Sequence, residues 1–562
     1  MKLGRIPHET IETDVLVVGG GLAGSMAAIK AREAGADVVL FEKAALRRSG
    51  NAGKGMDHLP IVAHPQLTTT PDELAGRSLI GVEGLVDPAL SYLVAREGYN
   101  RVLDLQDYGL EIAQKDGTLN FVPGRLELGH EHTEAKWSMI FFRGADLKLK
   151  LAREVRRRGI TVLDRTVGSG LLTDNERVIG ATGVNVRDGR FVVCSAKCTV
   201  LTTGGAHRLY PSPEGGLTNY YIPTNCGDGH AMAYRAGARL TGMEFIQVQT
   251  HTVDLPPGPR PHGFFVIMVS ETGEDLLKKL GMKGDLLRAH GLAARNEEKE
   301  GRLAYWNTDQ MSEEAIGFWR LGMANEDPIC LKFLKEEGLD FGRKRRQAKY
   351  RVYGLLRSMS GPIVNEECRT SLEGLYAAGD LVNSSTMGGA TGALATGGQA
   401  GKMAGGHALQ VGRGRLDEGQ VRREKDRIYA PMNNEEGLPP LVVEEKVKAL
   451  LAEHVGIERE EAKLKQAWDL LTEAETELMP QLSAMSPHDL LRAVEVQNIV
   501  AVAQAHVQAS LARTETRYSP FFIRVDYPEQ DDSRWQKAVI VQQHGGKMKV
   551  FSALPSGWME AE

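Results

Sequence analysis

Residues 13–24 read TDVLVVGGGLAG, and this stretch decides the fold. The apolar run predicts a buried strand, the glycines predict a tight turn, and the residues after them predict the start of a helix. Gly19 permits the turn, Gly21 lets the backbone approach a pyrophosphate, and Gly24 lets the helix pack on the strand. Phosphates bound here would lie at the positive end of that helix, next to Ala23.

A second strand is expected over residues 38–41, which read VVLF, and Glu42 stands at its end. A carboxylate in this place binds ribose hydroxyls, and Lys43 follows it directly. The order of strand, glycine turn, helix, strand and acid predicts dinucleotide binding. The alternative is a glycine-rich turn that binds no ligand.

Two stretches far along the chain favour FAD over NAD. Residues 374–380 read GLYAAGD, an apolar strand that ends in Gly379 and Asp380. The Asp380 carboxylate can accept hydrogen bonds from the ribityl hydroxyls of a flavin. Residues 388–398 read GGATGALATGG and predict a second helix start that a flat ring can approach. Its positive end would stabilise negative charge on the reduced ring. The alternative for this stretch is a helix that is only tightly packed.

These segments resemble the flavoprotein superfamily of fumarate reductase, succinate dehydrogenase, L-aspartate oxidase and the adenylylsulfate reductase alpha subunit. Residues 48–55 (RSGNAGKG) are similar to the family's flavin-contacting loop, and 201–205 (LTTGG) to the strand and glycine pair under the ADP. Residues 227–229 (GDG) are similar to the entry into the cap, and 513–517 (RTETR) to the C-terminal domain. With the residues above, the expected FAD-binding set is Gly19, Gly21, Ala23, Gly24, Glu42, Lys43, Ser49, Gly50, Asn51, Gly53, Gly55, Val167, Thr203, Gly204, Gly205, Asp228, Gly379, Asp380, Ala393 and Leu394.

The resemblance implies an α/β fold: a Rossmann-like FAD-binding domain, an inserted α+β capping domain and a C-terminal helical domain. The expected bounds are 1–225 and 356–410 for the two parts of the FAD-binding domain, 226–355 for the capping (substrate) domain, and 411–562 for the C-terminal helical domain with its tail. A chain of 562 residues is too long to fold around a single hydrophobic core, so its length alone predicts two or three domains. Periodicity predicts helices over 442–454, 459–479 and 489–511, and strands at 539–541 and 550–551.

The composition bounds the partners. The 68 basic and 73 acidic residues give a formal net charge of −5, so neither nucleic acid nor an anionic membrane is an expected partner. The sequence has no apolar run of transmembrane length and no apolar signal core, which predicts a cytoplasmic protein without direct membrane insertion.

The cysteine pattern bounds the electron route. None of the five cysteines, Cys194, Cys198, Cys226, Cys330 and Cys368, forms a CxxC pair, so neither an iron–sulfur cluster nor a redox-active disulfide is expected. His130 and His132 flank Glu131 without a third ligand, which favours a surface loop and no metal site. A second G-x-G-x-x-G is missing, so no built-in NADH site is expected.

The family's substrate residues are largely replaced. Gln249 stands where the dicarboxylate enzymes have a histidine, and His251 lies two residues on. The cap stretch 264–285 has no counterpart of the family's proton-donor arginine, and residues 383–389 replace its His-Gly-Ala-Asn-Arg segment. A buried carboxylate without a cationic partner is costly, which argues against fumarate or succinate as the substrate. Gly50 replaces the histidine to which FAD is attached covalently, so FAD is expected to be non-covalent.

Four residues remain as candidates for substrate chemistry. His251 could transfer a proton or bind an oxyanion, and His262 lies in a proline-rich cap loop that could close over the substrate. Arg143 and Arg357 could bind an anion. A structural role is the alternative for each of the four.

The middle of the chain, including 142–144 and 136–140, resembles most the adenylylsulfate reductase alpha subunit, which receives electrons from a separate ferredoxin-like subunit. The resemblance therefore implies an FAD-dependent oxidoreductase, the flavoprotein subunit of a complex. It would exchange electrons between a small substrate at flavin N5 and an iron–sulfur or other electron-carrier protein. The alternative is an electron-transfer subunit with no substrate site of its own. An L-aspartate-oxidase-like enzyme is a third possibility, weakened by the same missing residues.

Overall fold

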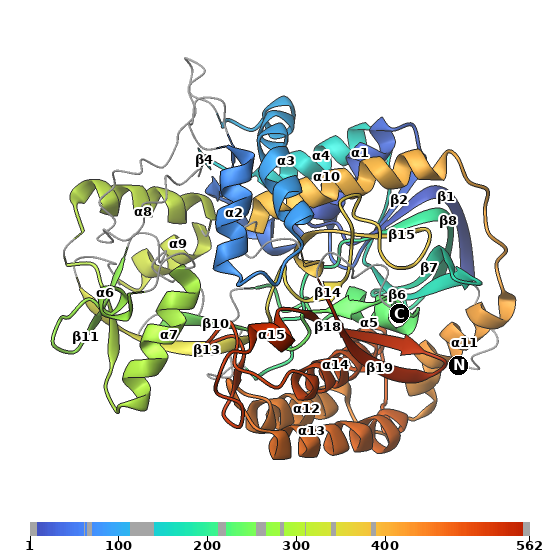
Figure 1. Ribbon diagram of the computed structural model, residues 1–562. Coiled ribbons are helices and arrows are strands. Elements are labelled where there is room, and N and C mark those ends of the chain that lie inside the picture. The colour runs from blue at the N-terminus through green and yellow to red at the C-terminus, as the bar shows by residue number, and fades with distance from the viewer. Residues whose placement is uncertain are drawn as a thin grey trace.

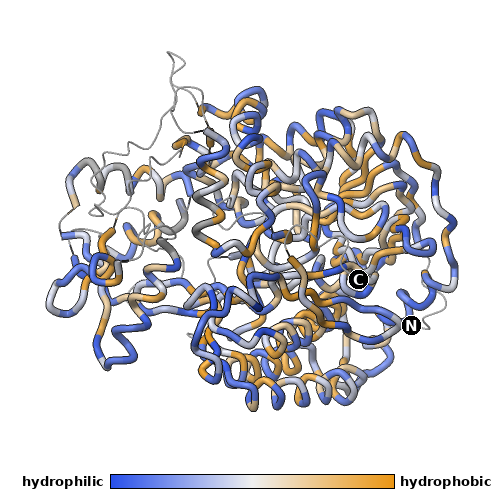
Figure 2. Tube along the Cα trace, viewed as in Figure 1, coloured by the Kyte–Doolittle hydropathy of each residue, from blue (hydrophilic) through white to orange (hydrophobic). Residues whose placement is uncertain are grey.

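The computed structural model describes residues 8–60, 62–63, 70–112, 140–211, 221–253, 266–281, 286–309, 311–326, 328–338, 344–383 and 389–554. Figure 1 shows a central sheet covered by helices, a lobe built from the middle of the chain, and a group of C-terminal helices on the opposite side of the sheet from α1 and α10. Hydrophobic residues concentrate in the sheet and in the helices packed on it, while the peripheral turns are hydrophilic (Figure 2).

The main sheet has seven strands in the order β5-β2-β1-β8-β7-β6, with β15 also paired to β8. Their bounds are β1 His8–Val18, β2 Val38–Glu42, β5 Thr161–Asp164, β6 Thr166–Asp174, β7 Arg177–Asn185, β8 Phe191–Leu201 and β15 Leu375–Ala377. Strands β5, β2, β1, β8 and β15 are mutually parallel, and Val18 pairs with both Phe41 and Leu201. The carboxyl ends of these strands therefore meet at one edge, which is where open α/β sheets bind their ligands.

The remaining edge of β8 is divided between two strands. Antiparallel β7 pairs with its first half, and parallel β15 pairs with its last three residues. The short strand 375–377 thus reaches the same ligand edge as β1 and β2, although it comes from a distant part of the chain.

Helices α1 (Leu22–Glu33) and α10 (Gly389–Ala408) pack directly on each other on one face of the sheet. Glycines on α10 meet alanines on α1, in the pairs Gly397–Ala23, Gly401–Ala27 and Gly405–Ala31. A Cβ added at Gly401 would lie 2.1 Å from the Ala27 carbonyl oxygen. From Gly397 onward, α10 is therefore tightly packed on α1. The same side carries α2 (Pro71–Gly81), α3 (Pro88–Asp107) and α4 (Leu147–Arg157).

The lobe formed by the middle of the chain has its own antiparallel sheet, in the order β10-β13-β12-β11, and its own core around Met268, Trp306 and Trp319. Its elements are β10 Ile246–Thr252, β11 Ile267–Ser270, α6 Leu276–Leu280, α7 Leu286–Lys299, β12 Ala304–Asn307, α8 Glu313–Glu326, α9 Pro328–Glu336 and β13 Arg345–Leu355. The predicted domain bounds stay predictions. Within the segment predicted as cap, α5 (Asp228–Arg235) contacts β6 and α14 instead of this lobe.

The C-terminal region contains α11 Glu418–Tyr429, α12 Pro440–His454, α13 Glu461–Glu473, α14 Pro487–Ala512, α15 Asp532–Trp535, β16 Glu458–Arg459 and β17 Ile523–Arg524. A single helix was expected over 459–479. The α-helix α13 covers only part of this range, and a π-helical turn over Ala474–Leu478 continues it. Strands β18 (Ala538–His544) and β19 (Lys547–Ala553) form a hairpin, and β18 also pairs with β9 (Leu240–Thr241), which pairs with β14 (Gly361–Pro362). The tail thus completes a sheet begun far upstream.

A fully buried charge cluster holds the C-terminal region against the start of the lobe. Arg513 donates to the carboxylates of Glu244 (2.9 Å) and Glu515 (2.7 Å), and Arg517 also donates to Glu515. Glu244 lies two residues before β10, the lobe's first strand, so residues 513–517 (RTETR) bind the chain where it enters the lobe. No helix in the described ranges is long and apolar enough to cross a membrane. The predicted α/β architecture with its C-terminal helical domain is confirmed.

Candidate functional site

A cavity follows the edge where the parallel strands end, and it holds about 1190 Å³ of unfilled space, part of it open to solvent. Fifteen of the twenty expected FAD-binding residues line it, namely Gly19, Gly21, Ala23, Glu42, Lys43, Gly50, Asn51, Gly55, Val167, Thr203, Gly204, Asp228, Gly379, Asp380 and Ala393. The other five expected residues are not among the described residues that line the cavity: Gly24, Ser49, Gly53, Gly205 and Leu394.

The glycine turn has the shape that a pyrophosphate requires. Gly19 has a φ of +104°, and a Cβ added there would lie 2.5 Å from the Thr202 carbonyl oxygen. A Cβ at Gly24 would lie 1.7 Å from the Gly19 carbonyl oxygen, so this glycine serves the close packing of α1. The nearest atom to a Cβ at Gly21 is 3.8 Å away, and α1 begins there without a side-chain cap. The helix N-terminus is therefore open to an anion.

Glu42 is fixed at the wall of the cavity by two backbone hydrogen bonds. Its carboxylate accepts from the Gly20 and Ala44 amides, each at 2.7 Å. A carboxylate has about four acceptor positions, so two remain for ribose hydroxyls.

The opposite part of the cavity has Asp380 as its acceptor. Ser358 Oγ donates to Asp380 at 3.1 Å, and Asn51 Nδ2 donates to it at 3.2 Å. A Cβ at Gly50 would lie 2.9 Å from Gly21 Cα, so the loop and the glycine turn touch as backbones. A histidine at this position would push the turn away. The residues present therefore fit non-covalent FAD.

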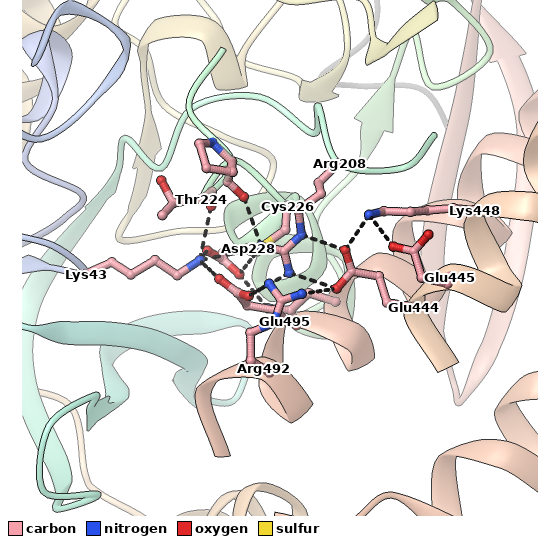
Figure 3. A network of polar contacts seen from close by, with 12 residues as sticks. Lys43, Arg208, Thr224, Cys226, Asp228, Glu444, Glu445, Lys448, Arg492 and Glu495 are labelled. Atoms are coloured by element: carbon pink, nitrogen blue, oxygen red, sulfur yellow. Dashed lines mark hydrogen bonds and ion pairs between the residues drawn. The ribbon is translucent and has the colours of Figure 1, made fainter. Parts of the chain in front are cut away.

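Lys43 and Asp228 line the cavity, but their charges belong to a buried ion network (Figure 3). Lys43 Nζ lies 2.7 Å from both Asp228 Oδ2 and Glu495 Oε1. Burial alone would raise the pKa of Glu495, but the charges of Lys43 and Arg208 outweigh it and lower this pKa to about 2. The network continues through Arg208 to Glu444, and so connects the end of β2 to α14 and α12. The sequence predicted that Lys43 and Asp228 would lie in the cofactor site, but it did not predict their ion partners.

Arg357 lines the end of the cavity that faces the lobe. Its guanidinium carbon lies 5.8 Å from the centre of the Tyr221 ring, and that ring stacks on His207 at 3.8 Å. Burial, with a smaller contribution from Arg357, lowers the pKa of His207 to about 3, so this imidazole is neutral. Gln249 Nε2 donates to the Tyr221 hydroxyl at 3.3 Å.

The other candidates for substrate chemistry differ in their placement. His251 is half-buried on β10, where the two-residue period of a strand puts it on the same face as Gln249. Arg143 is exposed, and it is not among the described residues that line the cavity. His262, together with His130 and His132, lies outside the described residues.

Sequence reasoning missed a pair beside the flavin loop. His58 Nδ1 lies 2.5 Å from Asp57 Oδ1, and Glu326 of α8 acts on the same imidazole. Burial lowers the pKa of His58, but Asp57 and Glu326 outweigh it, so the net shift is upward. An acid followed by a histidine directly after the 48–55 loop was a usable signal. Glu326 had none, because it reaches the site only through the folding of the lobe.

Comparisons with known proteins identify the family to which the chain belongs. The family model described as FAD binding domain matches residues 14–398, and the model described as fumarate reductase flavoprotein C-term matches residues 444–553. A subunit of the CoM/CoB fumarate reductase from Methanothermobacter marburgensis is 26% identical over 566 residues, covering 95% of this chain and 97% of that protein. L-aspartate oxidase from Mycobacterium bovis is 28% identical over 446 residues, covering 74% of this chain and 80% of that protein.

Among solved structures, adenylylsulfate reductase from Archaeoglobus fulgidus has a TM-score of 0.88 at 23% identity, covering 99% of this chain and 97% of that chain. This likeness shows the common fold. The match to the FAD binding domain spans more than half of the chain, and the resemblance drawn from the motifs is thereby confirmed. The chain belongs to the fumarate reductase and succinate dehydrogenase flavoprotein family and is an FAD-dependent oxidoreductase.

Proposed function

We propose that the protein is the flavoprotein subunit of a complex and passes electrons between a small substrate and an iron–sulfur or other electron-carrier protein. The observation that carries the proposal is the extent of the cavity. It begins at the glycine turn, follows the strand ends, and finishes at Arg357 and at Glu326 of the lobe. FAD, when bound, supplies the electron exchange. The residues beyond the nucleotide half are then available to a second molecule.

The chain's own residues have distinct tasks in this proposal. Arg357 binds an anionic group of the substrate, because a guanidinium pairs well with carboxylate and other oxyanions. Gln249 donates a hydrogen bond to the Tyr221 hydroxyl and so holds the Tyr221 ring next to the Arg357 guanidinium. The His58–Asp57 pair stores a proton near the same end, and His251 is a second group that can transfer one.

We further propose that fumarate is not the physiological substrate. The relatives named above include a fumarate reductase and an L-aspartate oxidase. In this chain, however, Gln249 replaces the family histidine and Arg143 is exposed outside the cavity. The test is fumarate reduction with reduced methyl viologen as donor. The expected turnover is far below the enzyme median of about 10 per second, and a rate near that median contradicts the proposal.

Electrons are proposed to arrive from a protein and not directly from NADH. The single G-x-G-x-x-G is assigned to FAD, and the relative that this chain covers to 97% of its length is itself named as a subunit. Stopped-flow mixing without oxygen tests this: NADH and NADPH leave the flavin absorbance unchanged, whereas a reduced ferredoxin bleaches it. Fast bleaching by either nucleotide would point to a self-sufficient reductase.

The second candidate is an electron-transfer subunit without a substrate site, favoured by the loss of the family's substrate cations. The two functions differ in the effect of small anions on the flavin. With a substrate site, at least one member of a panel of small carboxylates and sulfur oxyanions shifts the flavin absorbance of the wild type. Arg357→Met abolishes this shift, while Arg143→Met, which removes an exposed arginine, leaves it intact. If every anion leaves the spectrum unchanged, the second candidate stands.

A further inference from the structure

Lys148 is a buried cation placed directly beneath the glycine turn. It is the second residue of α4, and only 1% of its surface is exposed. Its ammonium donates to the Gly20 carbonyl oxygen, to Ser25 Oγ at 3.0 Å and, more weakly, to the Gly21 carbonyl oxygen at 3.4 Å. Ser49 Oγ donates to the same Gly20 carbonyl at 2.8 Å.

These contacts fix the direction of two peptide groups. Both peptide bonds are trans, so the amides of Gly21 and Leu22 point away from the carbonyls that Lys148 binds. Gly20, Gly21 and Leu22 all line the cavity, and the two amides belong to the start of α1. Lys148 therefore binds the carbonyl oxygens, which are the negative ends of these two peptide dipoles. Their positive ends, the amides of Gly21 and Leu22, are left for the phosphates.

The charge of Lys148 has no carboxylate within ion-pair distance among the described residues. Glu42 on β2 is the acidic group that acts on it, while α1 contributes the neutral Ser25. Two short turns, Leu46–Arg48 and Asn51–Lys54, also pack on α4. Their charged residues are all cations: Arg47 and Arg48, which are exposed, and Lys54. Burial lowers the pKa of Lys148 to about 8, and Glu42 offsets only part of that effect.

We propose that Lys148 is a positioning residue that supplies the counter-charge for the pyrophosphate of FAD, and that FAD binding at alkaline pH is coupled to uptake of a proton by its amine. The inference rests on the assignment of FAD to this cavity. It goes further by making the affinity depend on pH through one named residue.

The direction of the coupling follows from the charges. Two phosphate charges brought to the far side of the turn favour the ammonium form, so the pKa of Lys148 rises on binding. Below pH 8 the ammonium is present in both states, and the affinity is constant. Above the pKa of the free protein the amine is neutral and must gain a proton when FAD binds. The dissociation constant then rises by up to about tenfold per pH unit until the pKa of the bound state is reached.

The experiment titrates the flavin-free protein with FAD between about pH 6.5 and 9.5, following flavin fluorescence. Calorimetry in two buffers with different ionisation enthalpies counts the protons taken up. For the wild type we expect a constant dissociation constant up to pH 7.5, a rise above pH 8, and a proton count that increases from near zero toward one. Lys148→Met is expected to bind roughly tenfold or more weakly at neutral pH and to lose both the alkaline rise and the proton uptake.

Lys150→Met is the matched control. Lys150 lies on the same helix and pairs with Asp146 at 3.1 Å, so the change removes an equal charge without touching the turn. It should keep the wild-type pH profile. A wild-type affinity and proton count that stay constant over the range overturn the proposal, and so does an alkaline rise that persists in Lys148→Met. If Lys148→Met does not fold, the wild-type proton count decides. Whether FAD binds at pH 7 tests the assignment of FAD to this cavity. The pH dependence of the dissociation constant tests the role of Lys148 separately.

Discussion

Replacing Glu42 by glutamine is the most direct test of the nucleotide half of the site. The carboxylate is 5% exposed and accepts two backbone amides at 2.7 Å. In Glu42→Gln one oxygen remains as acceptor, while the new NH₂ group faces the other amide. The change removes one hydrogen bond to a charged group and leaves a buried donor without a partner, which together cost about 1.5–3 kcal/mol.

Because Gly20 belongs to the turn that faces the pyrophosphate, most of this loss should appear in FAD binding. The expected effect is a dissociation constant about ten- to a hundredfold higher, with a lower melting temperature of the flavin-free protein. Fluorescence titration and thermal melting measure the two quantities. Glu12→Gln, the same change on an exposed residue of β1, is the control and should alter neither. If Glu42→Gln binds FAD within threefold of the wild type at an unchanged melting temperature, the role given to the two amide bonds is wrong.

Three further predictions concern the flavin linkage, the helix packing and the buried histidine. Acid precipitation should release intact FAD, because the backbone contact at Gly50 leaves no room for an attachment histidine; flavin retained by the precipitated chain would contradict this. Gly401→Ala should lower the melting temperature, since its Cβ would lie 2.1 Å from the Ala27 carbonyl oxygen, whereas Gly406→Ala on the same helix meets nothing within 4 Å and should stabilise by about 0.5–1 kcal/mol. The His58–Asp57 pair raises the pKa of His58, so its stabilisation should be full below the unfolded pKa of about 6.5 and should disappear as pH rises through the folded value. Melting temperatures of the wild type and His58→Gln across that range measure this, and parallel curves would argue against it.

The sequence by itself determined the parts of the site that depend on short stretches of chain. The glycine turn, the strand that ends in Glu42 and the Gly379–Asp380 strand end each require particular residue types at fixed spacing, since a turn, a close backbone approach and an acceptor are local demands. Their relative placement also follows from a general rule, because parallel strands of one sheet bring their carboxyl ends to one edge. The α/β architecture and FAD were therefore predictable.

Only the tertiary structure decided where long side chains direct their charges. Lys43 and Asp228 were expected to bind the cofactor. They line the cavity, but Glu495, from a helix more than 260 residues further along the chain, completes their ion network. Arg143 was a candidate for binding a substrate anion, and it is exposed and not among the described residues that line the cavity.

The two ends of the cavity show the same division. Lys148 reached the turn, and Glu326 reached His58, through the packing of separate helices, and neither residue stands in a recognisable motif. A local motif encodes backbone shape, whereas a buried charge depends on every group that surrounds it. Those groups are assembled from distant segments only when the chain folds, and that is why the nucleotide half of this site could be predicted from the sequence and the ion partners could not.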